Sequence, residues 1–228
     1  ILSSDWSSDV CSSDLFNLML RNFRQSLSST AQIYTEQISG KVDKINSGSL
    51  ELVSLAASSQ NYYTSSPLGR YLTQQDILTR LQDRIRYVES SDLYFFYRTD
   101  SDELLTALSN RPSTGSSYFW NQYLMLPPTQ PANTWFSVTC NGETWLMCYY
   151  NVSQVRVGAA VRAKTLLQSL YADTGLVQDS GFALAGLDGT IVYSSQPDLM
   201  ACGTSLAGHI PASLIVESHT VPEVGTLL

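Results

Sequence analysis

The chain has 228 residues, of which 43% are hydrophobic and 14% are charged, and its formal net charge is −7. A chain of this length and apolar content folds around one large or two small cores, which excludes a disordered protein. The negative charge and the total of only 13 Lys and Arg argue against nucleic acid as a partner, because phosphate contacts need clustered basic side chains.

The four cysteines lie far apart in the sequence, at Cys11, Cys140, Cys148 and Cys202. No two of them have the C-x-x-C spacing of a zinc or redox site, and the chain has only two histidines to add as ligands. A disulfide scaffold would need a higher density of cysteine. We therefore expect no metal site and no cofactor.

The first fifteen residues do not resemble the start of a domain. They repeat the tripeptide Ser-Ser-Asp three times, and residues 9–15 read like the translation of a sequencing-library adaptor. Extraneous segments are set aside before a fold is predicted. We therefore expect residues 1–15 to be an artefact without fixed structure. If so, a genuine membrane segment that ended near Phe16 is missing.

Apolar residues recur in steps of three and four from Phe16 to Ala56, which predicts a long amphipathic helix over 16–66. Gly40 and Gly48 weaken it by about 1 kcal/mol each relative to alanine, so the helix needs packing along its apolar stripe. Two partners for this stripe remain open. The helix packs on a sheet of its own chain, or it pairs with a second copy in a homodimer.

Residues 67–172 are expected to form the first of two sheet domains. Residues 74–88 have the spacing of a second helix, and the aromatic run at 93–97 predicts a strand between two turns. Residues 110–133 are rich in Pro, Ser and Gly and also contain aromatic residues. They predict a long ordered loop with short helical pieces, and such loops often carry function.

The strongest local signal is the Asn-Gly pair at 141–142 between two apolar runs, because this pair adopts the positive φ angles of a two-residue hairpin turn. The predicted register places Cys140 opposite Glu143. Cys140 and Cys148 are then not cross-strand partners, so the hairpin contains no disulfide.

A strand over 155–161 and a short helix over 164–172 complete the first domain. A second domain over 173–228 begins with another hairpin, whose turn is the Asp-Gly pair at 188–189. The chain stops inside an expected strand at 224–228, so we expect this second domain to be incomplete.

The second hairpin reads Gly-Phe-x-Leu-x-x-Leu-Asp-Gly-Thr-Ile-Val-Tyr at residues 181–193. Together with the order of elements before it, this motif resembles the double Cache domain of bacterial receptors over residues 16–228. The resemblance implies an α+β fold in which a long N-terminal helix is followed by two PAS-like antiparallel sheet domains, the second truncated. Many members carry an aspartate in the strand that closes the first domain. Ala160 or Arg162 stands near that place here, so an amino-acid ligand is not implied.

The resemblance also implies a cellular role. Such domains lie outside the cytoplasm, are anchored in the cell membrane by flanking helices, and sense small molecules for a histidine kinase, a cyclase or a chemotaxis output. The sequence has no Gly-x-Ser-x-Gly elbow, no phosphate-binding loop and no His-Glu-x-x-His motif, so we expect it not to be an enzyme. The alternative is a ligand-free dimerisation or stalk module, in which the long helix is the functional surface.

The expected ligand site lies between the sheet of the first domain and the 110–133 loop. Pockets for small molecules are lined by aromatic side chains with a few polar groups. The aromatic candidates also suit core positions, and the one arginine among the candidates also suits the surface. The seven candidate ligand-binding residues are Tyr94, Arg98, Tyr118, Trp120, Tyr123, Trp135 and Trp145.

Overall fold

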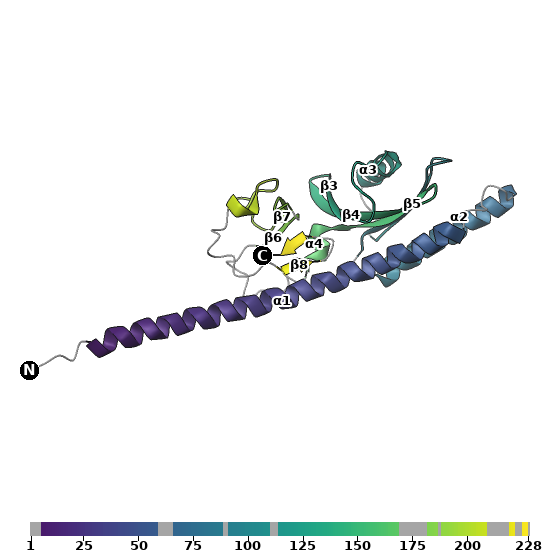
Figure 1. Ribbon diagram of the computed structural model, residues 1–228. Coiled ribbons are helices and arrows are strands. Elements are labelled where there is room, and N and C mark those ends of the chain that lie inside the picture. The colour runs from purple at the N-terminus through teal and green to yellow at the C-terminus, as the bar shows by residue number, and fades with distance from the viewer. Residues whose placement is uncertain are drawn as a thin grey trace, which may run out of the picture.

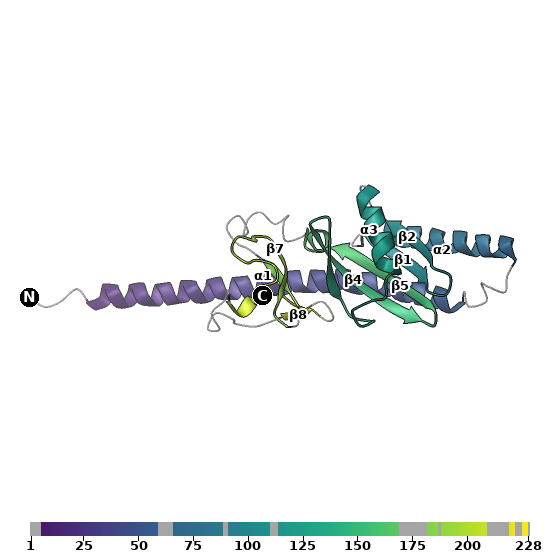
Figure 2. The ribbon, with the colours of Figure 1, turned by 90° about the horizontal axis from the view of Figure 1, so that it is seen from above.

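The computed structural model describes residues 6–58, 66–88, 91–109, 114–168, 182–186, 188–208, 219–221 and 225–227. In this part of the chain, two antiparallel sheets pack next to each other along one long helix (Figure 1, Figure 2). The large sheet covers the C-terminal part of the helix, and the small sheet lies nearer its middle. The N-terminal part of the helix extends beyond both sheets.

Helix α1 (Trp6–Ser58) has 53 residues, which corresponds to about 80 Å of length at 1.5 Å per residue. A long N-terminal helix is thus confirmed. The apolar stripe expected from the sequence is buried only from Tyr34 onward, where the sheets cover it. Leu20 and Phe23 belong to the same stripe but are exposed. Periodicity reveals the apolar face of a helix, but it does not reveal how far the covering sheet reaches.

The helix begins at Trp6, before the expected start at Phe16. Residues 6–15 are therefore helical, and the expectation that they lack structure was wrong. Extending a helix that is already nucleated adds one backbone hydrogen bond for each residue fixed, so residues of modest helix propensity such as Ser and Asp can follow. The adaptor origin of this segment stays a prediction.

Helix α2 (Pro67–Tyr87) starts earlier than the 74–88 segment expected from periodicity. Its start is set by two local signals. The Ser66 hydroxyl accepts a hydrogen bond from the Gly69 amide at 3.2 Å, and Pro67 occupies the first turn, where no amide proton is needed. The helix buries Ile77 and Leu81 against the sheet edge formed by β2.

Five strands form the large sheet, in the order β2-β1-β5-β4-β3, and every neighbouring pair is antiparallel. Their bounds are β1 (Leu93–Arg98), β2 (Glu103–Leu108), β3 (Phe136–Cys140), β4 (Glu143–Val152) and β5 (Val155–Arg162). The aromatic strand and the strand after the Asn-Gly hairpin are confirmed as β1 and β5. Strand β2 was not predicted from the sequence.

The hairpin of β3 and β4 has the predicted register. Asn141 and Gly142 have φ angles of 52° and 78°, and Cys140 pairs with Glu143. Cys140 and Cys148 are both buried, and neither forms a disulfide in the described part of the chain. The predicted register of the hairpin is therefore confirmed.

The large sheet lies between helices. Helices α1 and α2 cover one face, and α3 (Thr114–Met125) lies across the other (Figure 1). The predicted loop over 110–133 thus contains one regular helix of 12 residues. The side chains of the sheet accordingly divide into two apolar clusters, one facing α1 and one facing α3.

Helix α4 (Ala163–Leu166) follows β5 directly, while residues 169–172 of the expected helix lie outside the described residues. Beyond it, four strands form the small sheet in the order β7-β6-β9-β8, all neighbours antiparallel. Their bounds are β6 (Ala183–Ala185), β7 (Ile191–Ser194), β8 (His219–Val221) and β9 (Gly225–Leu227), and a short 3-10 helix, η2 (Leu206–Gly208), follows β7.

The turn between β6 and β7 is wider than a two-residue hairpin. The Gly189 amide donates to the Gly186 carbonyl at 2.9 Å, Gly189 has a φ of 78°, and the pairing shifts at a bulge between Leu184 and Ala185. The α+β fold with two antiparallel sheets is confirmed. The expected domain boundary near residue 172 lies outside the described residues. No helix among the described residues is long and apolar enough to cross a membrane.

Candidate ligand-binding site

A cleft opens on the α3 face of the large sheet. Its floor is formed by strand residues such as Phe95 and Met147, its wall by Tyr123 of α3, and its lip by residues 126–129. The cavity volume is about 100 Å³. Pockets for drug-sized ligands measure roughly 300–1,000 Å³, so this cleft suits a ligand with few non-hydrogen atoms.

Among the described residues that line the cleft, Arg156 of β5 is the one with a charge. Its side chain is held between two aromatic rings, with the guanidinium carbon 5.4 Å from the ring centre of Tyr97 and 5.6 Å from that of Tyr149. Nη1 donates to the carbonyl oxygens of Leu124 and Leu126, both at 2.9 Å. These contacts fix the guanidinium against the C-terminal end of α3.

The charge of Arg156 has no carboxylate partner among the described residues. Nε is buried there without a hydrogen-bond acceptor. Burial lowers the pKa of Arg156, while the electrostatic influence of Tyr149 and Tyr97 raises it. A guanidinium keeps its proton under all ordinary conditions, so the cleft contains a fixed positive charge.

Two tyrosines shape the cleft. The Tyr149 hydroxyl donates a hydrogen bond to the Gln130 carbonyl, which ties the segment after the lip to β4. Tyr123 stacks on Phe119 with ring centroids 5.7 Å apart. Burial raises the pKa of both tyrosines, so both hydroxyls stay protonated and can donate a hydrogen bond at neutral pH.

The structure brings three of the seven sequence-predicted site residues together. Tyr123 lines the cleft, and Trp120 and Trp145 are buried behind it with ring centroids 5.0 Å apart. Both indole N–H groups are buried without an acceptor among the described residues. Tyr118 lies on the same helix but is 68% exposed.

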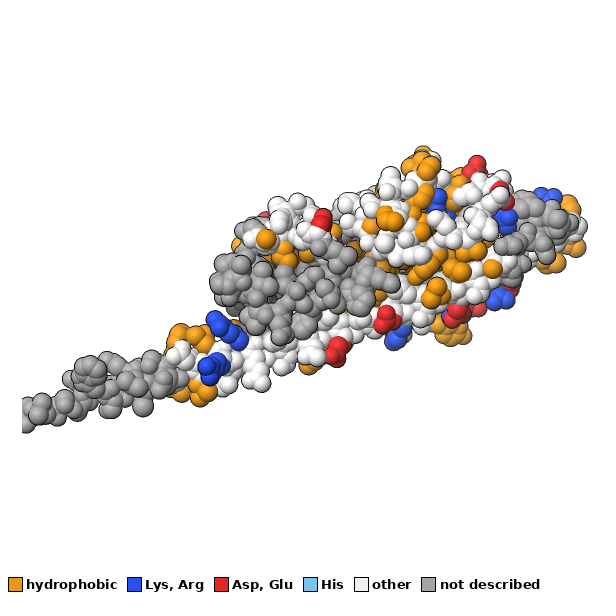
Figure 3. Space-filling model, in the orientation of Figure 1, with side chains coloured by type: hydrophobic (Ala, Val, Ile, Leu, Met, Phe, Trp, Pro, Cys, Tyr) orange, Lys and Arg blue, Asp and Glu red, His pale blue; other side chains and the backbone are white. Residues whose placement is uncertain are grey.

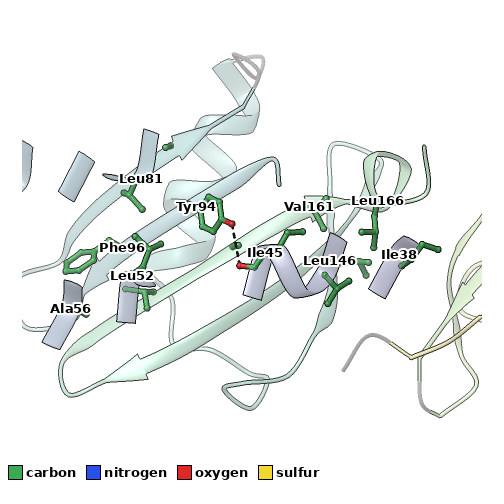
Figure 4. Packing of buried hydrophobic residues seen from close by; sticks show 14 of the residues in the cluster. Ile38, Ile45, Leu52, Ala56, Leu81, Tyr94, Phe96, Leu146, Val161 and Leu166 are labelled. Carbon is green, nitrogen blue, oxygen red and sulfur yellow. Dashed lines mark hydrogen bonds between the residues drawn. The ribbon is translucent and has the colours of Figure 1, made fainter. Parts of the chain in front are cut away.

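The other three lie elsewhere. Tyr94 is on the opposite face of the sheet, where its hydroxyl donates to the Ile45 carbonyl of α1 at 3.4 Å (Figure 4). Burial raises the pKa of Tyr94 to about 12. Trp135 packs against the same α1-facing cluster, and Arg98 makes a two-pronged ion pair with Asp100 at 3.0 and 3.2 Å.

Sequence reasoning missed Arg156, the most distinctive group in the cleft. One signal could have revealed it. Strand β5 reads Val-Arg-Val-Gly-Ala-Ala-Val, and all seven of these residues are buried. Burying a single arginine within an apolar strand costs folding free energy unless its charge has a partner. Such an arginine in a buried strand therefore indicates a binding role.

A second groove lies between α1 and α2 and is lined by both acids and bases. Its charges pair with one another, as in the ion pairs of Arg84 with Glu51 and of Arg80 with Asp76. No group of His, Cys, Asp and Glu among the described residues could hold a metal ion.

No model of a known protein family matches the chain, and no curated protein matches it closely enough to be a relative. Solved structures, in contrast, do match the chain. The periplasmic sensory domain of the Campylobacter jejuni chemoreceptor Tlp1 matches with a TM-score of 0.56 at 12% identity, covering 83% of this chain and 77% of that one. The Vibrio cholerae LuxQ periplasmic domain matches with a TM-score of 0.40 at 14% identity, covering 82% and 81%. The first match confirms that the chain has the fold of a periplasmic sensory domain, as the double Cache resemblance implied.

Proposed function

We propose that this chain is the extracytoplasmic sensing domain of a membrane signalling receptor, and that it binds a small molecule in the cleft beneath α3. The observation that carries the proposal is the cleft itself. It is a concave site with a largely apolar lining and, among the described residues that line it, one fixed charge, on a fold shared with a chemoreceptor sensory domain. The chain would then act by binding, with no catalytic step of its own.

Strand β5 connects the cleft to α1. Arg156 faces the cleft, whereas Val157 and Val161 pack into the cluster that faces α1. Helix α4 continues from β5, and the Lys41 ammonium of α1 donates to the Leu166 carbonyl at 2.9 Å. A ligand that shifts β5 would therefore displace α1, and α1 would pass the displacement to the membrane.

Exposed apolar side chains on α1 support a homodimer. Phe16, Met19 and Phe23 are each exposed by 60% or more, and Ile33 and Leu50 are more than half exposed. Figure 3 shows hydrophobic side chains gathered on the part of α1 that projects beyond the sheets. Exposed apolar patches of this kind mark interaction surfaces. The same observation favours the alternative function, a ligand-free dimerisation or stalk module.

A thermal-shift screen of the chain against a library of small metabolites separates the two functions. A ligand present at about 100 times its Kd stabilises the folded state by roughly 2.7 kcal/mol, which raises the melting temperature. Thr129→Trp, on the lip of the cleft, should abolish the rise. Thr139→Trp, an exposed position on β3 outside the lining, is the matched control and should keep it.

A metabolite that raises the melting temperature of the wild type and of Thr139→Trp, but not of Thr129→Trp, supports sensing in the cleft. If no metabolite in the library raises it and the melting temperature instead increases with protein concentration, the sensing proposal is wrong. The dimerisation module then remains.

A further inference from the structure

We propose that the cleft selects a small carboxylate with an apolar tail, and that Arg156 binds the carboxylate through the Nε side of its guanidinium. This inference rests on the proposed function, because it assigns a ligand class to the same cleft. It follows from three properties of the described lining residues: an unbalanced charge, a guanidinium edge without an acceptor, and the absence of aspartate and glutamate.

The charge of Arg156 is unbalanced. The residue is only 8% exposed, and the hydrogen-bond partners of its side chain are the neutral carbonyls of Leu124 and Leu126. These carbonyls lie at the end of α3 and just after it, and a helix C-terminus supplies only about half of a negative charge. Buried charges are normally paired, because an unpaired one loses its hydration without compensation. An anion in the cleft would supply the missing charge.

The free edge of the guanidinium fits a carboxylate. Nη1 is occupied by the two carbonyls, whereas neither Nε nor Nη2 has an acceptor among the described residues. These two nitrogens form one side of the planar guanidinium and can donate two parallel hydrogen bonds. A carboxylate accepts such a pair with both of its oxygens, and the rings of Tyr97 and Tyr149 hold the guanidinium in place for it.

The rest of the lining favours an apolar tail and disfavours an ammonium group. Phe95, Phe136 and Met147 supply aromatic and thioether surface, and the lip adds two prolines. Among the described residues, no aspartate or glutamate lines the cleft. An α-amino acid would place its ammonium group beside the cation of Arg156 without a carboxylate to pair with it. The cleft should therefore bind a simple carboxylate more tightly than the amino acid with the same skeleton.

Isothermal titration calorimetry of the whole chain tests the proposal with matched probes. The probes are the straight-chain carboxylates from acetate to hexanoate, the amide of each, 2-aminobutyrate, and inorganic phosphate. We expect at least one carboxylate to bind on the order of tenfold more tightly than its own amide, which corresponds to one charge-assisted hydrogen bond. Butyrate should bind more tightly than 2-aminobutyrate, and phosphate should bind more weakly than the best carboxylate because it has no apolar tail.

Arg156→Lys keeps the positive charge but removes the two-pronged edge, so it should weaken carboxylate binding by about tenfold or more. Arg80→Lys is the matched control, because Arg80 is exposed and lies outside the cleft. The melting temperature of each variant shows whether it folds. If Arg156→Lys does not fold, the comparison of carboxylates with their amides in the wild type still decides the matter.

Equal affinity for a carboxylate and its amide overturns the carboxylate proposal. A metabolite without an anionic group overturns it too, if that metabolite binds the wild type and its binding is lost in Thr129→Trp. In both cases sensing in the cleft stands. Phosphate that binds as tightly as the best carboxylate overturns the requirement for an apolar tail. If neither these probes nor the metabolite library bind, the proposed function itself is wrong.

Discussion

Asp92 holds together three strands of the large sheet at the point where β5 passes into α4. Its carboxylate is nearly buried, with 4% of the side chain exposed. It accepts hydrogen bonds from the Arg162 amide at 2.8 Å, from Arg162 Nη2 at 2.7 Å and Nε at 3.1 Å, and from the Ser109 hydroxyl at 3.1 Å. The hydrogen bond to Asp92 also raises the pKa of Arg162. Replacing Asp92 with alanine removes all four interactions at once.

The expected loss follows from burial. Removing one partner of a buried ion pair costs about 3–5 kcal/mol, because the other charge stays buried and unpaired. The Arg162 side chain is 29% exposed and regains part of its hydration, so we expect the lower end, about 3 kcal/mol, for Asp92→Ala. One kcal/mol corresponds to roughly 2–4 °C in a domain of this size, which gives a decrease in melting temperature of about 6–12 °C.

Urea unfolding followed by circular dichroism measures the free energy, and Asp76→Ala is the matched control. Asp76 forms an ion pair with Arg80 in which both side chains are more than half exposed, so its loss should cost about 0.5 kcal/mol or less. In the double variant Asp92→Ala/Arg162→Met, an apolar side chain replaces the unpaired charge, and part of the lost stability should return. An Asp92→Ala variant as stable as Asp76→Ala would contradict the importance of the buried ion pair. A double variant markedly less stable than Asp92→Ala alone would contradict it as well.

Three further predictions concern buried side chains. Burial raises the pKa of Tyr94 from 10.0 to about 12, so the stability that the protonated hydroxyl contributes is complete below pH 10 and is lost as the pH rises toward 12. Between pH 9 and 11.5, the free energy of unfolding measured with urea should fall by about 2 kcal/mol more in the wild type than in Tyr94→Phe. An equal fall in both proteins would contradict this. Trp120→Ala should lose roughly 3–5 kcal/mol in the same assay, because Trp120 is fully buried against Trp145; a loss below about 1 kcal/mol would contradict that packing. A water-soluble thiol reagent should modify Cys202 in the folded chain and modify Cys140 and Cys148 only after unfolding, as peptide mass spectrometry would show; early modification of either buried thiol would be inconsistent with the structure.

Local signals in the sequence predicted the elements that local chemistry determines. The Asn-Gly turn at 141–142 gave the hairpin and its register, because only a few residue pairs adopt that conformation. Strand β2 was missed for the opposite reason. Its sequence, Glu-Leu-Leu-Thr-Ala-Leu, is rich in residues that favour helices, and it becomes a strand because it pairs with β1 over all six residues.

The candidate site was predicted less well because aromatic composition does not reveal the direction of a side chain. Tyr94 and Phe95 are neighbours in β1, yet Tyr94 contacts α1 while Phe95 lines the cleft. Successive residues of a strand point to opposite faces, so a shift of one residue exchanges a core position for a site position. The candidate cleft lies between the sheet and the 110–133 segment, and Tyr123 is the one of the seven candidate residues in its described lining.

The same alternation gives β5 its place in the proposed mechanism. Val155, Val157, Ala159 and Val161 face α1, while Arg156, Gly158 and Ala160 face α3. Gly158 has no side chain where the ring of Phe95 and the backbone of β4 approach it, and a methyl group there would collide with both. The strand is therefore closely packed on both sides and paired with β1 and β4 along its length. In the proposed mechanism, a force on Arg156 would therefore act on a strand that is packed directly against α1.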